Sequence, residues 1–439
     1  MINISLLVRI FSYILLYLAY LIFMYGHAPL GIDWREWNIQ RIFNAVEYLR
    51  VNGLINSFGF TVWSKCNNCG FSSDEWIGQI YLSTTGLKFF PYYILNELGG
   101  YSMISLWGGV FDKVVIGITG IIISELSIIF AKDVSKLPNY FFGYVSFCLF
   151  ITAPWTYGIM LSSWAEMYFL LFFLLAMLLF SLSRNRFALF ALVLAGFFHY
   201  QWALVIAGFY MILNITLWQY KKDLIPRGFL PAFGRNHLGS IYIVFALILW
   251  PVIEIVILRE FALGVLGRHA GSTLLTRVGI SGNDIHNGGL LGAVQFLGGL
   301  RITHCFADYS NILLPGKVRE ATALYNCILS VSGMFMISVT SIAGVIFLVI
   351  KSPSARWIAF PLIFSLLVFV NFLQQSMSVH IYGYSYIFSF IFSIGIVGVF
   401  IYFSEKIKSV SVSLMVLLPV FIGILLLSIR VSMLINGSS

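Results

Sequence analysis

Long apolar runs recur along the whole chain, and they constrain its fold more than any other feature. A membrane-spanning helix needs about 20 largely apolar residues, and about eleven segments of this 439-residue sequence approach that description. They begin near Ser5, Val114, Tyr140, Met167, Phe187, Ala203, Gly239, Cys327, Trp357, Tyr386 and Val410. Because lipid offers no partners to free backbone groups, such runs must be helical. The sequence predicts an all-helical, polytopic integral membrane protein, with residues 1–439 forming a single membrane domain.

The composition agrees with a membrane protein. Apolar residues make up 60% of the chain, charged residues only 10%, and the mean hydropathy is +0.93. Soluble domains have about a quarter of charged residues. The net charge of +9 arises from short cationic clusters between the apolar runs and not from one basic block. We therefore expect membrane lipid, and no nucleic acid, among the partners.

The cationic clusters predict the orientation of the chain. Five connecting segments carry at least two Lys or Arg each, and all five fall on the cytoplasmic side if the N-terminus is cytoplasmic. They are residues 131–136, 183–186, 218–237, 351–356 and 404–409. The first run has no small-residue cleavage site after it, so we expect it to stay in place as a signal anchor.

This orientation leaves two long external loops, roughly residues 26–113 and 259–325. Of the 17 acidic residues of the chain, seven lie in the first loop and four in the second. Long loops without a role are unusual in compact proteins. Any chemistry is therefore expected on the external side.

The start of the first loop, "GIDWREWNIQRIFNAVEYLRVNG" (31–53), predicts an amphipathic helix at the membrane surface. Its apolar residues recur at helical spacing, with Arg41, Asn44 and Glu47 off that stripe. The stripe consists of Ile39, Ile42, Phe43, Val46 and Leu49.

Two carboxylates at the head of this helix have two compatible interpretations. Asp33 stands at an N-cap position and Glu36 follows three residues later, which is the spacing of a capping box. At the outer end of the first span, the same carboxylates can instead act as a general base toward a hydroxyl acceptor or hold a cation. A helix N-terminus keeps Asp33 ionised, which suits a base.

Glu166 is a second acid of interest, in "SSWAEMYFLLFFLLAML" at the external edge of the fourth run. An ionisable group at such a place is costly, and it is usually functional or paired. Its alternative role is an interfacial residue beside Trp164 and Tyr168. Glu125, inside the second run, is interpreted as structural.

The five cysteines favour an oxidising compartment. Cys66 and Cys69, in "KCNNCG", predict a local disulfide, because a zinc site would need two more ligands nearby. Cys148, Cys305 and Cys327 are isolated in the sequence.

The acid after the first run, then "REWNIQRIFNAVEYLRVNG", then "STTGLKFFPYYIL" (83–95), resembles the first external loop of the GT-C superfamily of membrane glycosyltransferases. That loop typically has an Asp or Glu, an amphipathic helix and a Lys-Pro-Pro-Leu-like stretch. Lys88 and Pro91 stand in the last element, although "KFFP" departs from it. Glu166 is similar to the acid that precedes the fourth span in the family. The resemblance covers roughly residues 1–220.

The resemblance implies a glycosyltransferase that uses a polyprenyl-phosphate-linked sugar, such as undecaprenyl-phosphate glucose, on the periplasmic face of a bacterial inner membrane. Within the superfamily the chain looks like the serotype-converting glucosyltransferases that decorate O-antigen, whose acceptor is a lipid-linked glycan. Asp33 would be the general base of an inverting transfer. Glu36 and Glu166 would orient the acceptor or the base, or bind a divalent cation; no other cofactor is implied.

The leaving phosphate of such a donor needs cations nearby, and Arg suits phosphate through its planar fork. The candidates are Lys88 in the first loop and a set of residues in the second loop. That set is Arg268, His269, Arg277, Arg301 and His304.

Two other functions stay open. An O-antigen polymerase shares lipid-linked substrates, but such polymerases rely on arginine-rich external loops, whereas here acids stand beside the first and fourth runs. A flippase or other transporter of lipid-linked oligosaccharides would have ionisable residues near the middle of the bilayer and often paired repeats, and the sequence has no evident repeat.

Overall fold

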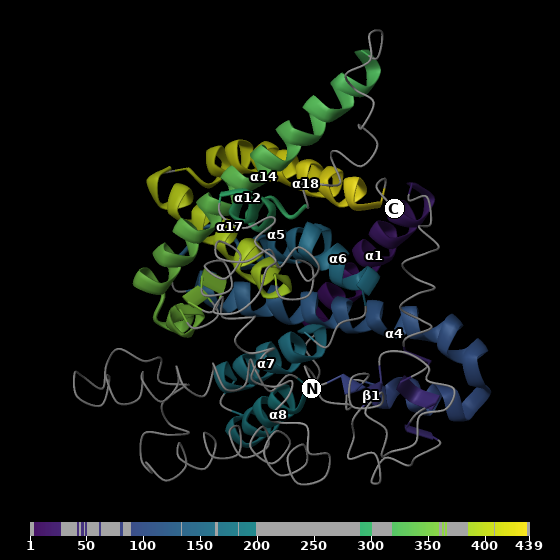
Figure 1. Cartoon of the computed structure of the whole chain (residues 1–439). Helices are drawn as coiled ribbons and strands as arrows, with labels where there is room; N and C mark the ends of the chain where they lie inside the picture. Colours follow the sequence, from purple (N-terminus) through teal and green to yellow (C-terminus); the bar gives the residue numbers. More distant parts are fainter. Residues whose placement is uncertain are drawn as a thin grey trace.

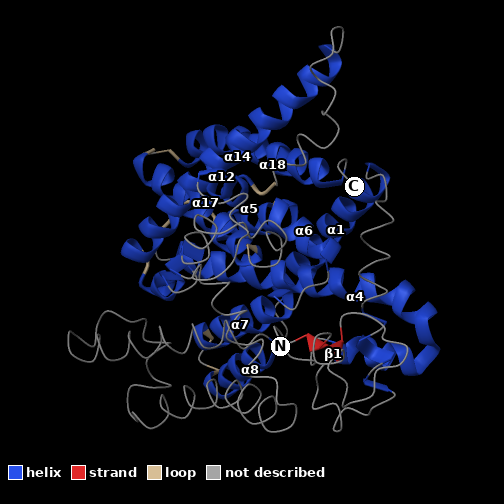
Figure 2. Ribbon diagram, in the orientation of Figure 1, coloured by secondary structure: helices blue, strands red, loops and turns tan. Residues whose placement is uncertain are grey.

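The computed structural model describes sixteen segments of the chain, and nothing below concerns the residues between them. They are residues 4–27, 42–43, 45–47, 49–50, 61–62, 80–81, 89–132, 134–162, 166–182, 184–198, 290–300, 318–359, 362–363, 365–366, 385–407 and 409–436. Apart from a two-residue antiparallel pair of β1 (Thr61–Val62) and β2 (Ile80–Tyr81), the regular structure in these segments is helical (Figure 2). The all-helical prediction is confirmed for this part of the chain.

Most of the helices follow the apolar runs (Figure 1), whereas Leu290–Gly298 lies within residues 259–325, which the sequence predicts as an external loop. The helices are α1 (Ile4–His27), α4 (Phe90–Lys132), α5 (Asn139–Thr152), α6 (Pro154–Ser162), α7 (Glu166–Ser181), α8 (Asn185–Phe198), α12 (Leu290–Gly298), α14 (Val318–Lys351), the 3₁₀ helix η4 (Pro353–Ile358), α17 (Tyr386–Lys406) and α18 (Val410–Asn436).

Five of these helices are long and apolar enough to cross a membrane. The five stretches are Ser5–Met24, Val110–Lys132, Leu324–Lys351, Tyr386–Lys406 and Val410–Ile435. Helices α5 and α6, which are bent by 53° relative to each other, are together long and apolar enough to count as a sixth if the bent pair is one span and not a re-entrant loop. The runs predicted from Met167 and Phe187 form apolar helices that are shorter than a span. The runs near Ala203 and Gly239, and most of the run near Trp357, lie outside the described residues, so the full expected number is not tested.

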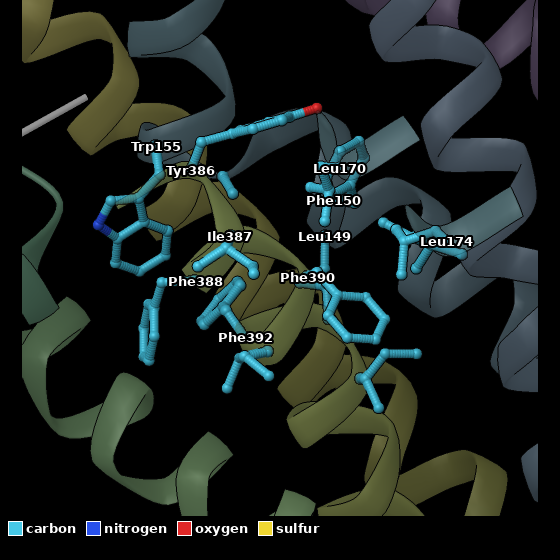
Figure 3. Packing of buried hydrophobic residues seen from close by; sticks show 14 of the residues in the cluster. Leu149, Phe150, Trp155, Leu170, Leu174, Tyr386, Ile387, Phe388, Phe390 and Phe392 are labelled. Carbon is cyan, nitrogen blue, oxygen red and sulfur yellow. The ribbon is translucent and has the colours of Figure 1, made fainter. Parts of the chain in front are cut away.

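Helix α17 lies at the centre of the apolar core, and most of its residues, 16 of 21, are buried. Trp155 of α6 packs its ring against Phe388 and Phe392 of α17, with centroids 4.9 and 5.5 Å apart (Figure 3). Helices α1 and α18 are peripheral and leave many large apolar side chains exposed, among them Phe11, Ile22 and Met415. Such an outer surface suits contact with lipid.

Helices α14 and α17 pack backbone to backbone through small residues. A methyl group added at Gly395 would lie 2.1 Å from the Ser341 carbonyl oxygen, and one at Gly344 would lie 1.9 Å from the Gly395 oxygen. Small residues allow this approach in membrane helices. The contacts advance along both helices in the same direction, so the two helices are parallel. Lys351 and Lys406 therefore end them on the same side, as the cationic-loop pattern predicts.

Short helix α12 ends inside the bundle, where its last carbonyl groups need partners. The Trp155 indole N–H donates to the Phe296 carbonyl at 2.7 Å, and the Ser338 hydroxyl donates to the Leu297 carbonyl at 2.7 Å. Gly299 follows with φ of +70°, and an added methyl there would lie 2.7 Å from Pro154. Irregular backbone at membrane depth is tolerated only when neighbours satisfy it in this way.

At the bend between α5 and α6, the last helix, α18, supplies hydrogen-bond donors to a backbone carbonyl group. Pro154 has no backbone N–H to donate, and the Thr152 carbonyl just before it accepts the hydroxyls of Ser428 at 3.0 Å and Ser432 at 2.9 Å. All three of these polar residues are buried. The bend therefore depends on α18.

Replacing Ser428 and Ser432 together by Ala should lower thermal stability clearly more than the sum of the single replacements. Either hydroxyl alone can donate to the Thr152 carbonyl, so each single variant should lose about 0.5 kcal/mol of the free energy of unfolding. The double variant leaves this buried acceptor without a donor, so it should lose about 1–3 kcal/mol. Melting of the purified protein in mild detergent measures this non-additivity. Strictly additive effects would contradict the shared role.

Two sequence expectations concern single residues of the bundle. Glu125, interpreted as structural, forms an ion pair in which its Oε2 lies 3.1 Å from Nη2 of Arg9 on α1, and the pair is partly buried. Cys327, which has no neighbouring cysteine in the sequence, is disulfide-bonded. Cys148 is free, and the predicted Cys66–Cys69 pair lies outside the described residues.

Candidate functional site

Part of the first long loop folds as a small unit with its own apolar core. Ile42, Ala45, Val46 and Leu49 are buried, as their helical spacing predicts, and residues 42–50 are helical where they are described. They pack against Phe89, Tyr92 and Ile104. The polar face of residues 42–50 also contacts α4, because the Asn96 amide donates to Glu47 Oε1 at 3.1 Å. On the same face, Arg50 forms an ion pair with Glu47 at 3.0 Å.

Helix α4 folds back on itself within this unit. Its backbone leaves helical geometry at Gly99 and Gly100, and Gly100 has φ of +64°, which favours glycine. The break divides α4 into a first arm, Phe90–Leu98, and a second arm, Tyr101–Lys132 (Figure 1). The second arm contains the membrane-crossing stretch Val110–Lys132.

The two arms and α7 meet at one buried carboxylate, that of Asp112. The hydroxyl of Tyr92, from the first arm, donates to Asp112 Oδ1, and the hydroxyl of Tyr168, from α7, donates to the same oxygen at 3.1 Å. The two phenol oxygens are 3.4 Å apart. The exposed fractions are 0% for Asp112, 2% for Tyr92 and 3% for Tyr168. These three residues are called the Asp112 cluster below.

The chemistry of the Asp112 cluster follows from its burial. A buried carboxylate is costly unless hydrogen-bond donors replace its lost water, and two phenol groups supply such donors here. Burial raises the pKa of the Tyr92 phenol well above its usual range, and the nearby Asp112 charge raises it further. Tyr92 is therefore a lasting donor at neutral pH and not a base.

Helix α1 also reaches this region. The Tyr17 hydroxyl donates to the carbonyl oxygen of Lys113, the next residue after Asp112, at 2.9 Å. Tyr17 also packs on Gly117, where an added methyl would lie 3.0 Å from its ring. The first span, the second span and α7 thus converge where the first loop joins the bundle.

The Asp112 cluster lies at helix ends that face away from the cationic segments. Asp112 is near the start of Val110–Lys132, whose other end is Lys132. Tyr168 is near the start of α7, whose other end leads to Arg184. If cationic segments are cytoplasmic, the cluster is on the external side.

Most residues that the sequence singled out lie outside the described part of the chain. This holds for Asp33, Glu36 and Lys88 of the first loop, and for the second-loop set Arg268, His269, Arg277, Arg301 and His304. Glu166 begins α7, two residues before Tyr168, but its side chain is not described. The expected convergence of Asp33 and Glu166 is therefore not tested. In the described segments, no group of three His, Cys, Asp or Glu residues is arranged to hold a metal.

Asp112 was missed as a site residue by the sequence reasoning, which counted it only among the acids of the first loop. One signal was present: "WGGVFDKVVIG" places an acid and a lysine at the start of an apolar run. The two tyrosine partners are 20 and 56 residues away along the chain. No local pattern connects them.

No family model, no curated protein and no solved structure matches this chain. Its function must therefore be inferred from its own residues.

Proposed function

We propose that this protein is an integral membrane glycosyltransferase. It transfers a sugar, with glucose as the first candidate, from undecaprenyl phosphate to a lipid-linked glycan such as O-antigen, on the periplasmic side of a bacterial inner membrane. The observation that carries the proposal is the Asp112 cluster. It joins the first arm of α4, which overlaps the Lys88–Pro91 element, to the helix that Glu166 begins, and both segments are among those that carry the resemblance to GT-C enzymes.

The substrates explain why a site would lie there. A polyprenyl-phosphate sugar keeps its tail in lipid and its head group at the membrane surface, so the reacting atoms stay near helix ends. The small unit of the first loop lies against such an end, because Tyr92 belongs to its apolar core and also to the Asp112 cluster. Beside it, α1 exposes apolar side chains such as Leu15, Leu18 and Ile22.

The proposed reaction is a direct displacement with inversion. Asp33 takes the proton from the acceptor hydroxyl while that oxygen forms a bond to the anomeric carbon. The bond from the anomeric carbon to the phosphate oxygen breaks, and the electron pair leaves with polyprenyl phosphate. Second-loop cations such as Arg268 and Arg301 stabilise the developing charge. Glu36 and Glu166 orient the acceptor or the base, or hold a divalent cation if one takes part.

The expected result of expressing the gene in a bacterial host of defined O-antigen is a new side-branch sugar on an otherwise unchanged repeat unit. Composition and linkage analysis of the purified polysaccharide measures it, and the empty vector is the control. A change in polysaccharide chain length without a new sugar would instead indicate a polymerase. A shift of lipid-linked units from the cytoplasmic to the periplasmic side, without a new sugar, would indicate transport.

A further inference from the structure

The Asp112 cluster joins parts of the chain that its helices alone would keep apart. On a straight helix, Tyr92 and Asp112 would be roughly 30 Å apart, because each residue adds about 1.5 Å. Their hydrogen bond requires the reversal at Gly99 and Gly100. The bond therefore exists only while the first arm of α4 is folded against the second arm.

Tyr168 extends this connection to α7. Its hydroxyl is 3.1 Å from Asp112 Oδ1, and its ring stacks on Phe198 of α8 at a centroid distance of 5.1 Å. The ring of Phe111 contacts both tyrosine rings, with centroid distances of 6.4 Å to Tyr92 and 6.1 Å to Tyr168. A carboxylate that accepts hydroxyls from two different segments fixes those segments relative to each other.

We infer that Asp112 is a positioning residue, whose carboxylate holds the loop-1 unit (residues 42–50 with the first arm of α4) against the start of α7. By fixing the loop-1 unit relative to α7, Asp112 would keep two parts of the active site correctly placed for the reaction. This consequence rests on the proposed function. Asp112 acts through Tyr92 and Tyr168 and does not touch the reacting atoms. The carboxylate is better suited to this than a neutral group, because hydrogen bonds to a charged acceptor are about twice as strong as neutral ones.

The attachment of the loop-1 unit through Asp112 is tested by amide hydrogen exchange on the purified full-length protein in nanodiscs. In Asp112→Ala, peptides covering residues 89–98 should exchange about tenfold faster or more, because two buried donors lose their acceptor. Peptides from α17 should keep the wild-type rate. Asp112→Asn, which keeps an acceptor oxygen but loses the charge, should show a smaller increase, and so should Tyr168→Phe.

The matched control is Tyr13→Phe. It removes a buried phenol hydroxyl from α1, in a residue whose ring packs on Tyr144 and Phe147 of α5 and not on the loop-1 unit. Exchange in residues 89–98 should not change in this variant. Unchanged exchange there in Asp112→Ala would overturn the inference, as would an equal increase in α17, which would mean a general loss of stability.

The consequence is tested by sugar transfer in proteoliposomes that contain undecaprenyl-phosphate glucose as the donor and a lipid-linked O-antigen unit as the acceptor. In Asp112→Ala, kcat should fall about tenfold or more while KM changes less, because misplaced groups slow the reaction more than they weaken binding. Asp112→Asn should recover part of kcat. Wild-type kcat in Asp112→Ala would overturn the positioning role. If the wild-type protein transfers no sugar, the proposed function fails, and the exchange experiment alone decides the hold.

Discussion

Replacing Gly395 by Val should prevent stable assembly of the helix bundle. Even the first carbon of a side chain at this position would lie 2.1 Å from the Ser341 carbonyl oxygen and 2.6 Å from the carbon of that carbonyl. Those atoms belong to the backbone of α14, so no rotamer change removes the clash. Helices α14 and α17 would have to separate, which breaks the packing of the most buried of the five helices that are long and apolar enough to cross a membrane.

We expect the Val variant to lose about 3 kcal/mol of stability or more, at the upper end of the range for overpacked cores. The yield of monodisperse protein after detergent extraction and the thermal midpoint measure the effect. Gly344→Ala should also lower stability and yield, since its added methyl would lie 1.9 Å from the Gly395 carbonyl oxygen.

Gly423→Ala is the matched control for these glycine variants. Gly423 lies within α18, another helix that can cross the membrane, and an added methyl there meets nothing within 4 Å. The variant should extract and melt as the wild type does, or slightly better, because Ala favours a helix over Gly. A Val variant at Gly395 that melts like this control would show that α14 and α17 do not pack as described.

The helices were predictable because lipid imposes a simple rule on sequence. Runs beginning near Ser5, Cys327, Tyr386 and Val410 became helices long enough to cross a membrane. The apolar stripe of the first loop was also visible, since Ile42, Val46 and Leu49 have helical spacing and are buried. In both cases the signal is local, so the chain shows it without tertiary information.

What the sequence could not show depends on contacts between distant segments. The bend at Pro154 has a local signal, but the hydroxyls of Ser428 and Ser432 that satisfy it come from 276 and 280 residues away. The disulfide of Cys327 was also not predicted, because the sequence places no other cysteine close to it.

The Asp112 cluster combines a local signal and a distant one. The pair Gly99–Gly100 could have indicated a reversal before the second span, and with it the return of the first arm. Even so, an acid at the start of an apolar run is compatible with an interfacial role, and only the positions of Tyr92 and Tyr168 make it a buried acceptor. The acids of the first loop form a pattern along the chain that the sequence shows directly, whereas the contacts of Asp112 do not.

Replacing Asp33 by Asn should abolish sugar transfer while the protein still inserts and folds. Asn keeps the size and the capping ability of Asp, so the variant should keep the helix cap that the sequence predicts at this position. It cannot accept the proton of the acceptor hydroxyl, and loss of a general base lowers rates by about 10²–10⁴-fold. The measurement is transfer from undecaprenyl-phosphate glucose in proteoliposomes, with the melting curve recorded on the same sample.

Glu97→Gln separates this effect from a general need for negative charge in the first loop. Glu97 is an exposed carboxylate on the first arm of α4, in the same loop as Asp33. If Asp33 is the base, the Glu97 variant keeps wild-type kcat, and the Asp33 variant loses transfer at every acceptor concentration, because saturation cannot replace a missing base. Full transfer by Asp33→Asn would remove Asp33 from the mechanism. Loss of transfer in both variants would mean that the charge of the loop, and not one proton acceptor, is what the reaction needs.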